Sequence, residues 1–410
     1  MGASVAKTID ELGALEAAGV SQHMADIASS SPTTLWVSPG REPIAALIAI
    51  CGDFLPAGKL SIRDASSWGE MAGGIGPCFQ NVAATFVNLE CCLDVGNLCP
   101  RTLNGLGDIV CAPVESLDYL AAIRTVAVSM ANNHSFDFGE AGVERSRIAV
   151  LRHSLIPLGA GRTLRESPEV FVWSGPHGIR VGFWAAATAT LDPATSQKVG
   201  VEPATIARAR QALAELKCRG AGLSIALLHA GCLRTSRPDP EQVQLMDSIA
   251  KSGFDIVAAS HSHRISGYSR LRENDIAPSF CFYGLGSLVS GYAACPLEKE
   301  GLVVVVGLNR RGQVASLELN PVVLDDTGFG TMPSPQMKQE ILARFDSLSA
   351  ELAGGFYEHR FYRDISQGLL RLYVRDVKAA YRTEGIRGLA RKTSRVRARH
   401  VRRVVRGILG

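Results

Sequence analysis

The sequence lacks any apolar stretch long enough to cross a membrane, because no run approaches the ~18 uncharged apolar residues that a membrane helix needs. Residues 1–11 contain neither a basic segment nor a following apolar segment, so they do not predict a secretory signal. Hydrophobic residues make up 46% and charged residues 20%, which is ordinary for a globular protein and excludes a disordered low-complexity chain. We therefore expect a soluble cytoplasmic protein.

The ten cysteines do not form the pattern of a disulfide framework or of a thiolate zinc site. No CxxC pair occurs with zinc-site spacing. Cys51 and Cys281 lie inside apolar runs, and Cys91 and Cys92 are adjacent, which makes them awkward to bridge. We expect most of these thiols to be buried and reduced.

Positive charge is scarce outside the C-terminal segment. Residues 371–410 hold 13 Lys and Arg and only two acidic residues, an excess of +11, whereas the rest of the chain carries −7. Apolar residues recur there at spacings of three and four, at Ile386, Leu389, Val396, Val404 and Ile408. This pattern predicts one or two amphipathic basic helices. They could be a solvated surface, associate peripherally with an anionic membrane, or bind an anionic polymer. Few aromatic residues accompany the charge, which argues against specific nucleic-acid recognition.

Histidine is also scarce, with nine in 410 residues, yet several follow strand-like apolar runs. The runs 44–51, 83–87, 125–130, 223–228 and 254–257 each lead into polar residues: Asp53; Asn88 and Glu90; Asn133 and His134; His229; and His261 and His263. We expect Gly52 and Asp53 to end the first strand. In α/β folds the carboxyl ends of the strands are where the chemistry is placed, so these side chains predict a metal site.

A mixed set of carboxylate, imidazole and amide ligands suits first-row divalent ions such as Mn²⁺, Fe²⁺ or Zn²⁺. The candidates exceed one tetrahedral site, and two ions about 3.5–4 Å apart, bridged by a carboxylate, would use them all. Such a centre activates water, so hydrolysis is the natural reaction class. His134, which directly follows the candidate ligand Asn133, is the candidate acid for the leaving group. Asn88 is either a further ligand or a loop cap.

The order of these motifs resembles the CapA (poly-γ-glutamate capsule synthesis) family, a branch of the calcineurin-like metallophosphoesterase superfamily. The resemblance covers about residues 45–325, and residues 131–139 are its most specific part. Its motifs are Gly52-Asp53, Asn88-Leu89-Glu90, Ala131 to Gly139, Gly159-Ala160-Gly161, His229-x-Gly231, His261-x-His263 and Tyr283-x-Leu285-Gly286.

The resemblance implies an α/β fold: a four-layer αββα metallophosphatase-like sandwich with two mixed β-sheets, followed here by a helical basic C-terminal extension. We accordingly divide the chain into an N-terminal extension (1–44), the CapA-like domain (45–325) and a helical, basic region (326–410). By motif matching the metal ligands are Asp53, Glu90, Asn133, His229, His261 and His263, with Glu90 bridging, and His134 is the catalytic acid.

The chain departs from the superfamily pattern at several positions. Asp53 is followed by Phe54-Leu55, where phosphoesterases have Asp-x-His, which leaves open whether one or two ions bind. Ala230 stands where the family usually has Trp, Ser262 where it has Pro, and Ser287-Leu288 where it has Asn-Phe. These changes are in positions suited to alter substrate recognition while sparing the ligands.

Two functions are consistent with this pattern. The first is a metal-dependent hydrolase in the synthesis or processing of a capsule or poly-γ-glutamate-type polymer, with metal-activated water attacking a phosphoester or a γ-glutamyl amide. Its partners would be a phosphoester substrate or an anionic polymer. The second is a metal-containing binding or assembly component of polymer biosynthesis that catalyses nothing.

Overall fold

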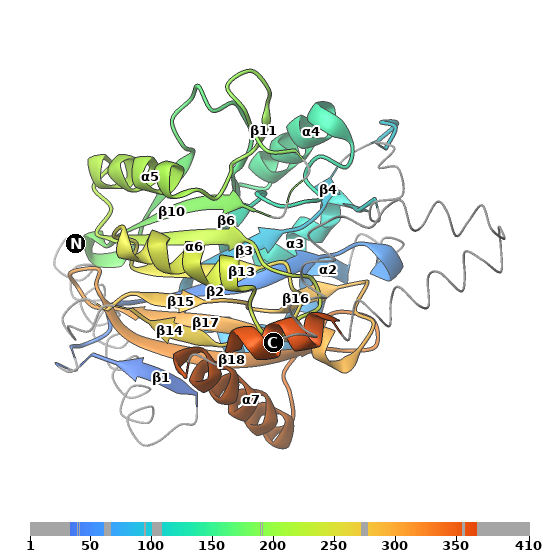
Figure 1. Ribbon diagram of the computed structural model, residues 1–410. Coiled ribbons are helices and arrows are strands. Elements are labelled where there is room, and N and C mark those ends of the chain that lie inside the picture. Colours follow the sequence, from blue (N-terminus) through green and yellow to red (C-terminus); the bar gives the residue numbers. More distant parts are fainter. Residues whose placement is uncertain are drawn as a thin grey trace, which may run out of the picture.

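The computed structural model describes residues 33–366, apart from 39, 41, 61–66, 94–95, 101–108, 189, 191, 272–277 and 355–356 (Figure 1). The basic helices expected in residues 371–410 therefore lie outside the described residues. Across the described ranges, no helix is long and apolar enough to cross a membrane. None of the ten cysteines, all of which lie within the described ranges, forms a disulfide.

The larger sheet is mixed and has nine strands. Its central strands are β2 (Ala46–Leu55), β3 (Val82–Leu89), β6 (Thr125–Ser129) and β7 (Ile156–Leu158), which run parallel to one another. Next to β2 lie the antiparallel strands β17 (Glu300–Leu308), β18 (Val314–Leu324) and β1 (Thr34–Val37). Two short strands join at the side, β16 (Ser287–Ser290) on β2 and β19 (Gly330–Thr331) on β18.

The smaller sheet has six strands in the order β14 (Tyr268–Arg270), β15 (Phe280–Phe282), β13 (Ile256–Ser260), β12 (Leu223–His229), β10 (Arg180–Ala187) and β9 (Val170–Ser174). The inner four are parallel, and the two outer strands are antiparallel to their neighbours. The inner strands are apolar along nearly their whole length because both of their faces are covered, as is usual for parallel sheets.

The two sheets pack face to face around one core. Phe86 of β3 stacks on Phe183 of β10 with ring centroids 3.4 Å apart, and Trp36 of β1 meets Phe280 of β15 edge-on at 5.4 Å. The helices α3 (Leu117–Ala122) and α4 (Gly139–Arg152) pack on the larger sheet. On the smaller sheet, α5 (Ile206–Cys218) and α6 (Pro240–Lys251) enclose a second apolar cluster (Figure 1). The expected four-layer αββα sandwich with two mixed sheets is confirmed.

The remaining described elements include one long helix and a helical stretch at 357–366. The long helix, α7 (Pro335–Ala353), contacts β14 and β18, and its Phe345 stacks on Tyr268. The short elements are α2 (Trp68–Met71), the strand pairs β4 (Cys92–Leu93) with β5 (Cys111–Ala112) and β8 (Ala160–Arg162) with β11 (Gly200–Val201), and the 3-10 helices Gly58–Leu60, Ala72–Phe79, Val114–Ser116, Pro176–Gly178 and Pro296–Glu298.

The expectation that Gly52 and Asp53 end the first strand is wrong. β2 continues to Leu55, because β16 pairs with residues 53–55 after β17 has paired with residues 46–51. β1 falls within the predicted N-terminal extension and pairs with β18. The proposed domain boundaries after residues 44 and 325 stay predictions.

Candidate metal centre

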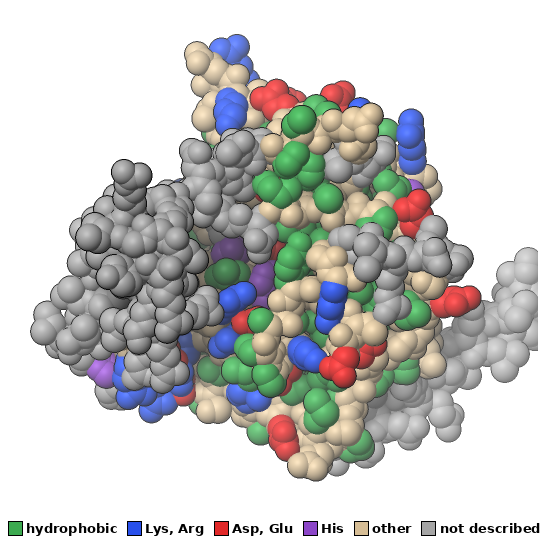
Figure 2. Space-filling view, turned by 90° about the vertical axis from the view of Figure 1, so that its right-hand side faces the viewer, with side chains coloured by type: hydrophobic (Ala, Val, Ile, Leu, Met, Phe, Trp, Pro, Cys, Tyr) green, Lys and Arg blue, Asp and Glu red, His purple; other side chains and the backbone are tan. Residues whose placement is uncertain are grey.

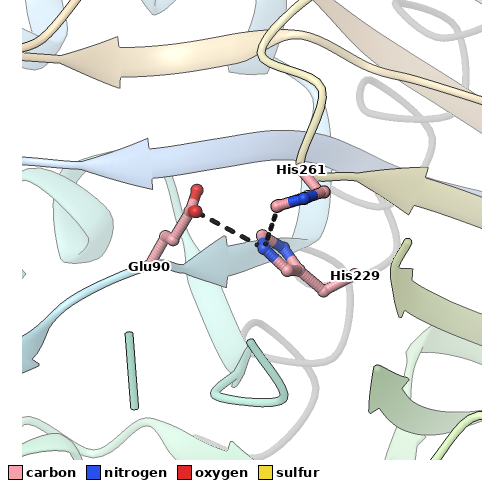
Figure 3. Close-up of side chains that lie close together, drawn as sticks. All are labelled: Glu90, His229 and His261. Atoms are coloured by element: carbon pink, nitrogen blue, oxygen red, sulfur yellow. Dashed lines mark hydrogen bonds and ion pairs between the residues drawn. The ribbon is translucent and has the colours of Figure 1, made fainter. Parts of the chain in front are cut away.

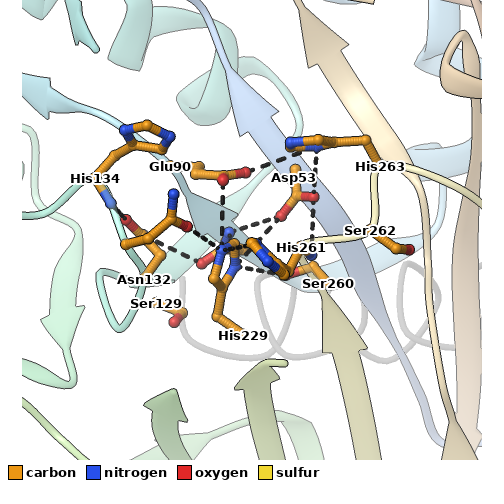
Figure 4. Close-up of polar contacts among 12 residues, drawn as sticks. Asp53, Glu90, Ser129, Asn132, His134, His229, Ser260, His261, Ser262 and His263 are labelled. Carbon is orange, nitrogen blue, oxygen red and sulfur yellow. Dashed lines mark hydrogen bonds and ion pairs between the residues drawn. The ribbon is translucent and has the colours of Figure 1, made fainter. Parts of the chain in front are cut away.

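The polar residues predicted to bind metal meet where strands of the two sheets end. Asp53 lies near the end of β2, Glu90 follows β3, His229 is the last residue of β12, and His261 follows β13 (Figure 4). Parallel strands in one sheet present their carboxyl ends at the same edge. Because the two sheets also lie face to face, residues separated by more than 200 positions become neighbours.

A contact between two glycines sets the position of Asp53. The amide of Asp53 donates to the carbonyl of Gly286 at 3.0 Å. A Cβ on Gly52 would lie 2.0 Å from that same carbonyl oxygen, a separation that no side chain can tolerate. The backbones of the Gly52-Asp53 motif and the Leu285-Gly286 motif thus approach each other closely. They do so at the point where β2 changes its partner from β17 to β16.

Two groups of ligand atoms share one carboxylate. The first group is Glu90, His229 and His261 (Figure 3), and the second is Asp53, Glu90 and His263. Within each group the ligand atoms all lie within 4.8 Å of one another. Glu90 belongs to both, which is the arrangement expected of a carboxylate that bridges two ions.

In the first group, several lone pairs converge on one imidazole nitrogen. Nε2 of His229 lies 2.6 Å from Oδ1 of Asn133, 2.9 Å from Nδ1 of His261 and 3.4 Å from Oε1 of Glu90. A single N–H can donate to only one of these three atoms, whereas a cation accepts lone pairs from all of them. The donor set of this group therefore fits a divalent cation.

In the second group, one histidine approaches two carboxylates. Nδ1 of His263 lies 3.0 Å from Oδ2 of Asp53 and 3.8 Å from Oε2 of Glu90. The amide of His261 also donates to Oδ2 of Asp53, at 3.2 Å. Both His261 and His263 have positive φ, 110° and 54°, a conformation that is strained for side chains other than glycine and that concentrates at functional sites.

The pKa values of the two buried carboxyl groups, Glu90 and Asp53, shift in opposite directions. Neither oxygen of Glu90 has a hydrogen-bond partner among the described residues, and burial together with the nearby Asp53 raises the Glu90 pKa to about 8. Burial would also raise the pKa of Asp53, but the contacts with His263 outweigh it and the pKa is lowered. A buried carboxylate without donors is costly unless a cation compensates it, so Glu90 fits a metal-binding role.

The three imidazoles respond to the same surroundings in different directions. Burial lowers the pKa of His229 to about 3 and also lowers that of His261, so both are neutral at pH 7 and able to donate a lone pair to a metal. Burial acts the same way on His263, but Glu90 and Asp53 prevail and raise its pKa to about 9.

Asn88 contacts two of the candidate ligands. Its Nδ2 donates to Oδ1 of Asp53 at 2.7 Å and lies 3.2 Å from Nδ1 of His229. An amide N–H is a donor and does not bind a metal. These contacts suit a residue that holds Asp53 and His229 in place, and the two roles expected from the sequence, a further ligand or a loop cap, stay predictions.

His134 lies beside the centre and has a carboxylate partner that the sequence reasoning missed. Its Nδ1 is 2.8 Å from Oδ2 of Asp137, and the amide of Val110 donates to the same oxygen at 2.7 Å. Burial opposes protonation of His134, but Asp137 and then Glu90 outweigh it, and the pKa is raised. The three-residue spacing between His134 and Asp137 was the available signal.

Asn132 is a second residue that the sequence reasoning passed over. Its Nδ2 donates to the carbonyl of Leu89 at 2.7 Å, and its Oδ1 accepts from the amide of His134 at 3.1 Å. It thereby ties the loop that carries Asn133 and His134 to the end of β3 (Figure 4).

The positions that depart from the superfamily pattern lie around the centre. Leu55, where a histidine would complete Asp-x-His, is buried in the core. Ala230 and Ser287 are also buried, and the hydroxyl of Ser262 donates to the carbonyl of Arg264. The side chain of Leu55 cannot bind metal, so the group that contains Asp53 and His263 lacks the ligand that a histidine at this position would supply.

The fold and the side chains together define a four-layer αββα protein with a candidate centre for divalent metal. The model of the family described as bacterial capsule synthesis protein PGA_cap matches residues 47–292, more than half of the chain, and the chain belongs to this family.

Curated relatives are similar over part of their length. The capsule biosynthesis protein CapA of Bacillus anthracis is 25% identical over 185 residues, 43% of each chain. The PGA biosynthesis protein CapA of Bacillus subtilis (strain 168) is 21% identical over 234 residues, 56% of this chain and 59% of the relative. The matched regions thus span about half of these relatives.

Solved structures are similar at low sequence identity. The 5'-nucleotidase precursor of Thermus thermophilus is 13% identical with a TM-score of 0.41, covering 74% of this chain and 58% of that one. The calcineurin-like phosphoesterase YfkN of Bacillus subtilis is 12% identical with a TM-score of 0.38, covering 74% and 97%. The NAD nucleotidase of Haemophilus influenzae is 13% identical with a TM-score of 0.39, covering 74% and 56%.

Proposed function

We propose that this member of the capsule synthesis family is a metal-dependent hydrolase acting in the synthesis or processing of a poly-γ-glutamate-type polymer. The observation that carries the proposal is the carboxylate of Glu90, which is buried, has no hydrogen-bond partner among the described residues and belongs to both ligand groups. A purely structural carboxylate at such a depth would be expected to have donors.

The residues that would hold the ions are Asp53, Glu90, Asn133, His229, His261 and His263. Their oxygen and nitrogen donors suit Mn²⁺, Fe²⁺ or Zn²⁺. When bound, such an ion polarises a phosphoryl or acyl oxygen and lowers the pKa of water. Asn88 keeps Asp53 and His229 in place for this task.

His134 supplies the proton in this proposal. Asp137 holds its Nδ1, so Nε2 is the nitrogen from which a proton can pass to the leaving group. The raised pKa keeps the ring protonated to a higher pH than an isolated histidine. The bond that breaks is a phosphoester or a γ-glutamyl amide; water adds to the phosphorus or carbonyl carbon, and the leaving oxygen or nitrogen takes the proton of His134.

The test combines metal content with turnover. Protein purified without chelator is expected to contain one or two equivalents of a divalent metal and to hydrolyse a phosphoester or a γ-glutamyl substrate. Glu90→Gln should lose metal and activity together. His134→Ala should keep its metal and lose roughly 100-fold or more in kcat. His359→Ala, an exposed histidine outside the site, is the matched control and should behave as wild type.

The outcome also separates the two functions considered from the sequence. A protein that holds the metal but turns over no substrate of either class would be a binding or assembly component, and the hydrolase proposal would fail. Wild-type turnover by His134→Ala would leave the hydrolase standing but remove His134 as its acid.

A further inference from the structure

Two arginines lie in the loops that carry the ligands. Arg264 directly follows His263, and Arg234 lies in the loop after His229. The amide of Arg234 donates to the carbonyl of Ser262 at 2.9 Å, so the two loops are joined beside the centre. Arg234 has a φ of 62°, so its backbone is also strained.

Both guanidinium groups share one carboxylate. Nε of Arg234 and Nη2 of Arg264 each lie 3.5 Å from the same oxygen of Glu298, while the other oxygen of Glu298 accepts from the amide of Ala294 at 3.0 Å. Glu298 is buried, whereas the side chain of Arg234 is 49% exposed. The two arginines and the one glutamate together carry a net charge of +1.

Among the described residues, the neighbouring acidic groups do not cancel that net positive charge. The charge of Glu300 also acts on Arg264, but Glu300 pairs with Arg344 of α7, so three arginines face two carboxylates. In the same loop as Arg234, Arg237 pairs with both Glu351 and Asp364, so it is fully neutralised. Arg237 thus has two acidic partners, as expected of an arginine with a structural role, whereas Arg234 and Arg264 share a single glutamate.

Arg264 also has more donors than acceptors around it. Apart from Glu298, its guanidinium contacts the thiol of Cys295 at 3.4 Å, and sulfur is a weak acceptor. Its Nε is buried and has no hydrogen-bond partner in the part of the chain that the structure describes. Guanidinium groups with unused donors match the paired oxygens of carboxylates and phosphates.

We infer that Arg234 and Arg264 form an anion subsite that binds a carboxylate or phosphate group of the substrate other than the group that reacts. Figure 2 shows histidine side chains inside a hollow and Lys or Arg side chains at its margin. The inference rests on the proposed function and specifies its substrate: a molecule with a second negative charge near the scissile bond, as in a polyanionic chain.

The experiment measures binding rather than turnover. Methylphosphonate presents only the group for the metal centre. Phosphonates with a terminal carboxylate, or with a second phosphonate, on a spacer of two to four carbons also present the second anion. Titration calorimetry on metal-loaded protein at constant ionic strength should show about tenfold tighter binding of a two-headed compound than of methylphosphonate. The preferred terminus distinguishes a carboxylate from a phosphate substrate.

The variants assign that preference to the two arginines. The ratio of the affinity for a two-headed compound to the affinity for methylphosphonate should fall close to one in the double variant Arg234→Ala/Arg264→Ala. It should fall only partly in Arg264→Lys. It should rise in Glu298→Gln, which removes the competing charge. Arg210→Ala, an exposed arginine of α5, is the control. Far-ultraviolet circular dichroism checks that each variant is folded.

Two results would overturn the subsite: equal binding of all the probes by wild type, or an unchanged ratio in the folded double variant. Failure of the proposed function is recognised separately. If the protein prefers the two-headed compounds but hydrolyses no substrate, the hydrolase proposal fails and the subsite stands. If it hydrolyses a substrate but shows no such preference, the subsite fails and the hydrolase proposal stands.

Discussion

Nδ1 of His134 lies 2.8 Å from the buried carboxylate of Asp137. The amide of Val110 holds the same oxygen in place, so the direction of the imidazole is fixed from behind. The pair gives the proposed acid both an orientation and a raised pKa. Its importance can be tested apart from metal binding, because Asp137 belongs to neither ligand group.

Asp137→Asn should lower kcat roughly 10- to 100-fold, as is typical when a residue that orients a functional side chain is replaced. Asp137 raises the pKa of His134, and an acid acts only while protonated. Activity therefore falls as the pH rises through that pKa, and the fall should begin at lower pH in the variant. A kcat–pH profile measures both effects.

Metal content of Asp137→Asn should stay at the wild-type value. Asp118→Asn, an exposed aspartate of α3, is the matched control. An unchanged pH profile in Asp137→Asn would show that the carboxylate does not tune the acid.

The metal-free protein should lose stability as the pH rises from 6.5 to 9. An unfolded glutamate releases its proton near 4.5, whereas burial holds the proton on Glu90 to about 8. His263 likewise keeps its proton to about 9 against an ordinary 6.5, because Glu90 and Asp53 outweigh its burial. For both groups the folded state binds more protons in this window, so stability falls with pH. His229 and His261 have lowered pKa values and act only below 6.5.

Urea midpoints of chelated and metal-loaded protein across this pH range provide the measurement. A bound cation favours ionised Glu90 and neutral His263, so metal should remove most of the slope. Glu90→Gln should reduce the slope in the chelated protein. A constant midpoint in chelated wild type would contradict the proposed protonation of the pair.

Gly52→Ala should destabilise the fold by about 3 kcal/mol or more, because its Cβ would lie 2.0 Å from the carbonyl oxygen of Gly286 and neither backbone can move freely. Gly73→Ala is the matched control. Its Cβ would meet nothing within 4 Å, and its effect should stay within about 1 kcal/mol. Denaturant unfolding of the two variants compares them, and equal midpoints would mean that the close approach relaxes readily.

Deleting residues 371–410 should abolish sedimentation with acidic liposomes if this segment forms the basic amphipathic helices predicted from the sequence. Binding by the full chain should weaken steeply as salt rises, since exposed charges are screened over about 10 Å at 0.1 M salt. Neutral liposomes serve as the control. Sedimentation that is indifferent to the deletion would rule out membrane association through this segment.

The position of the strands along the chain and the cluster of candidate ligands were predictable, because apolar runs and the polar residues that follow them are local features of the sequence. The predicted strands 125–130 and 223–228 agree with the bounds of β6 and β12 to within a residue or two. The resemblance supplied what periodicity cannot, the pairing of the strands into two sheets. The ligand roles themselves stay predictions until a metal is measured.

Other features depend on contacts that no local pattern specifies. The end of β2 was misplaced because β16, more than 230 positions later, pairs with its last residues. Asp137 is an exception, because its spacing of three residues from His134 was visible in the sequence, but the turn that brings the two side chains together was not predicted. Arg234 and Arg264 lie in two loops and Glu298 lies in a 3-10 helix, and only the folded structure shows that the two arginines contact the same carboxylate.

The change of partner along β2 has a consequence for how the protein is made. A ribosome that has reached residue 280 has already produced Asp53, Glu90, His229, His261 and His263, yet the strands that flank β2 on one side, β16 and β17, begin at residues 287 and 300. These contacts are among the most distant in the chain, and distant pairings form slowly. We therefore expect the end of β2, which carries Asp53, to reach its final position only after β17, which ends at Leu308, has been synthesised.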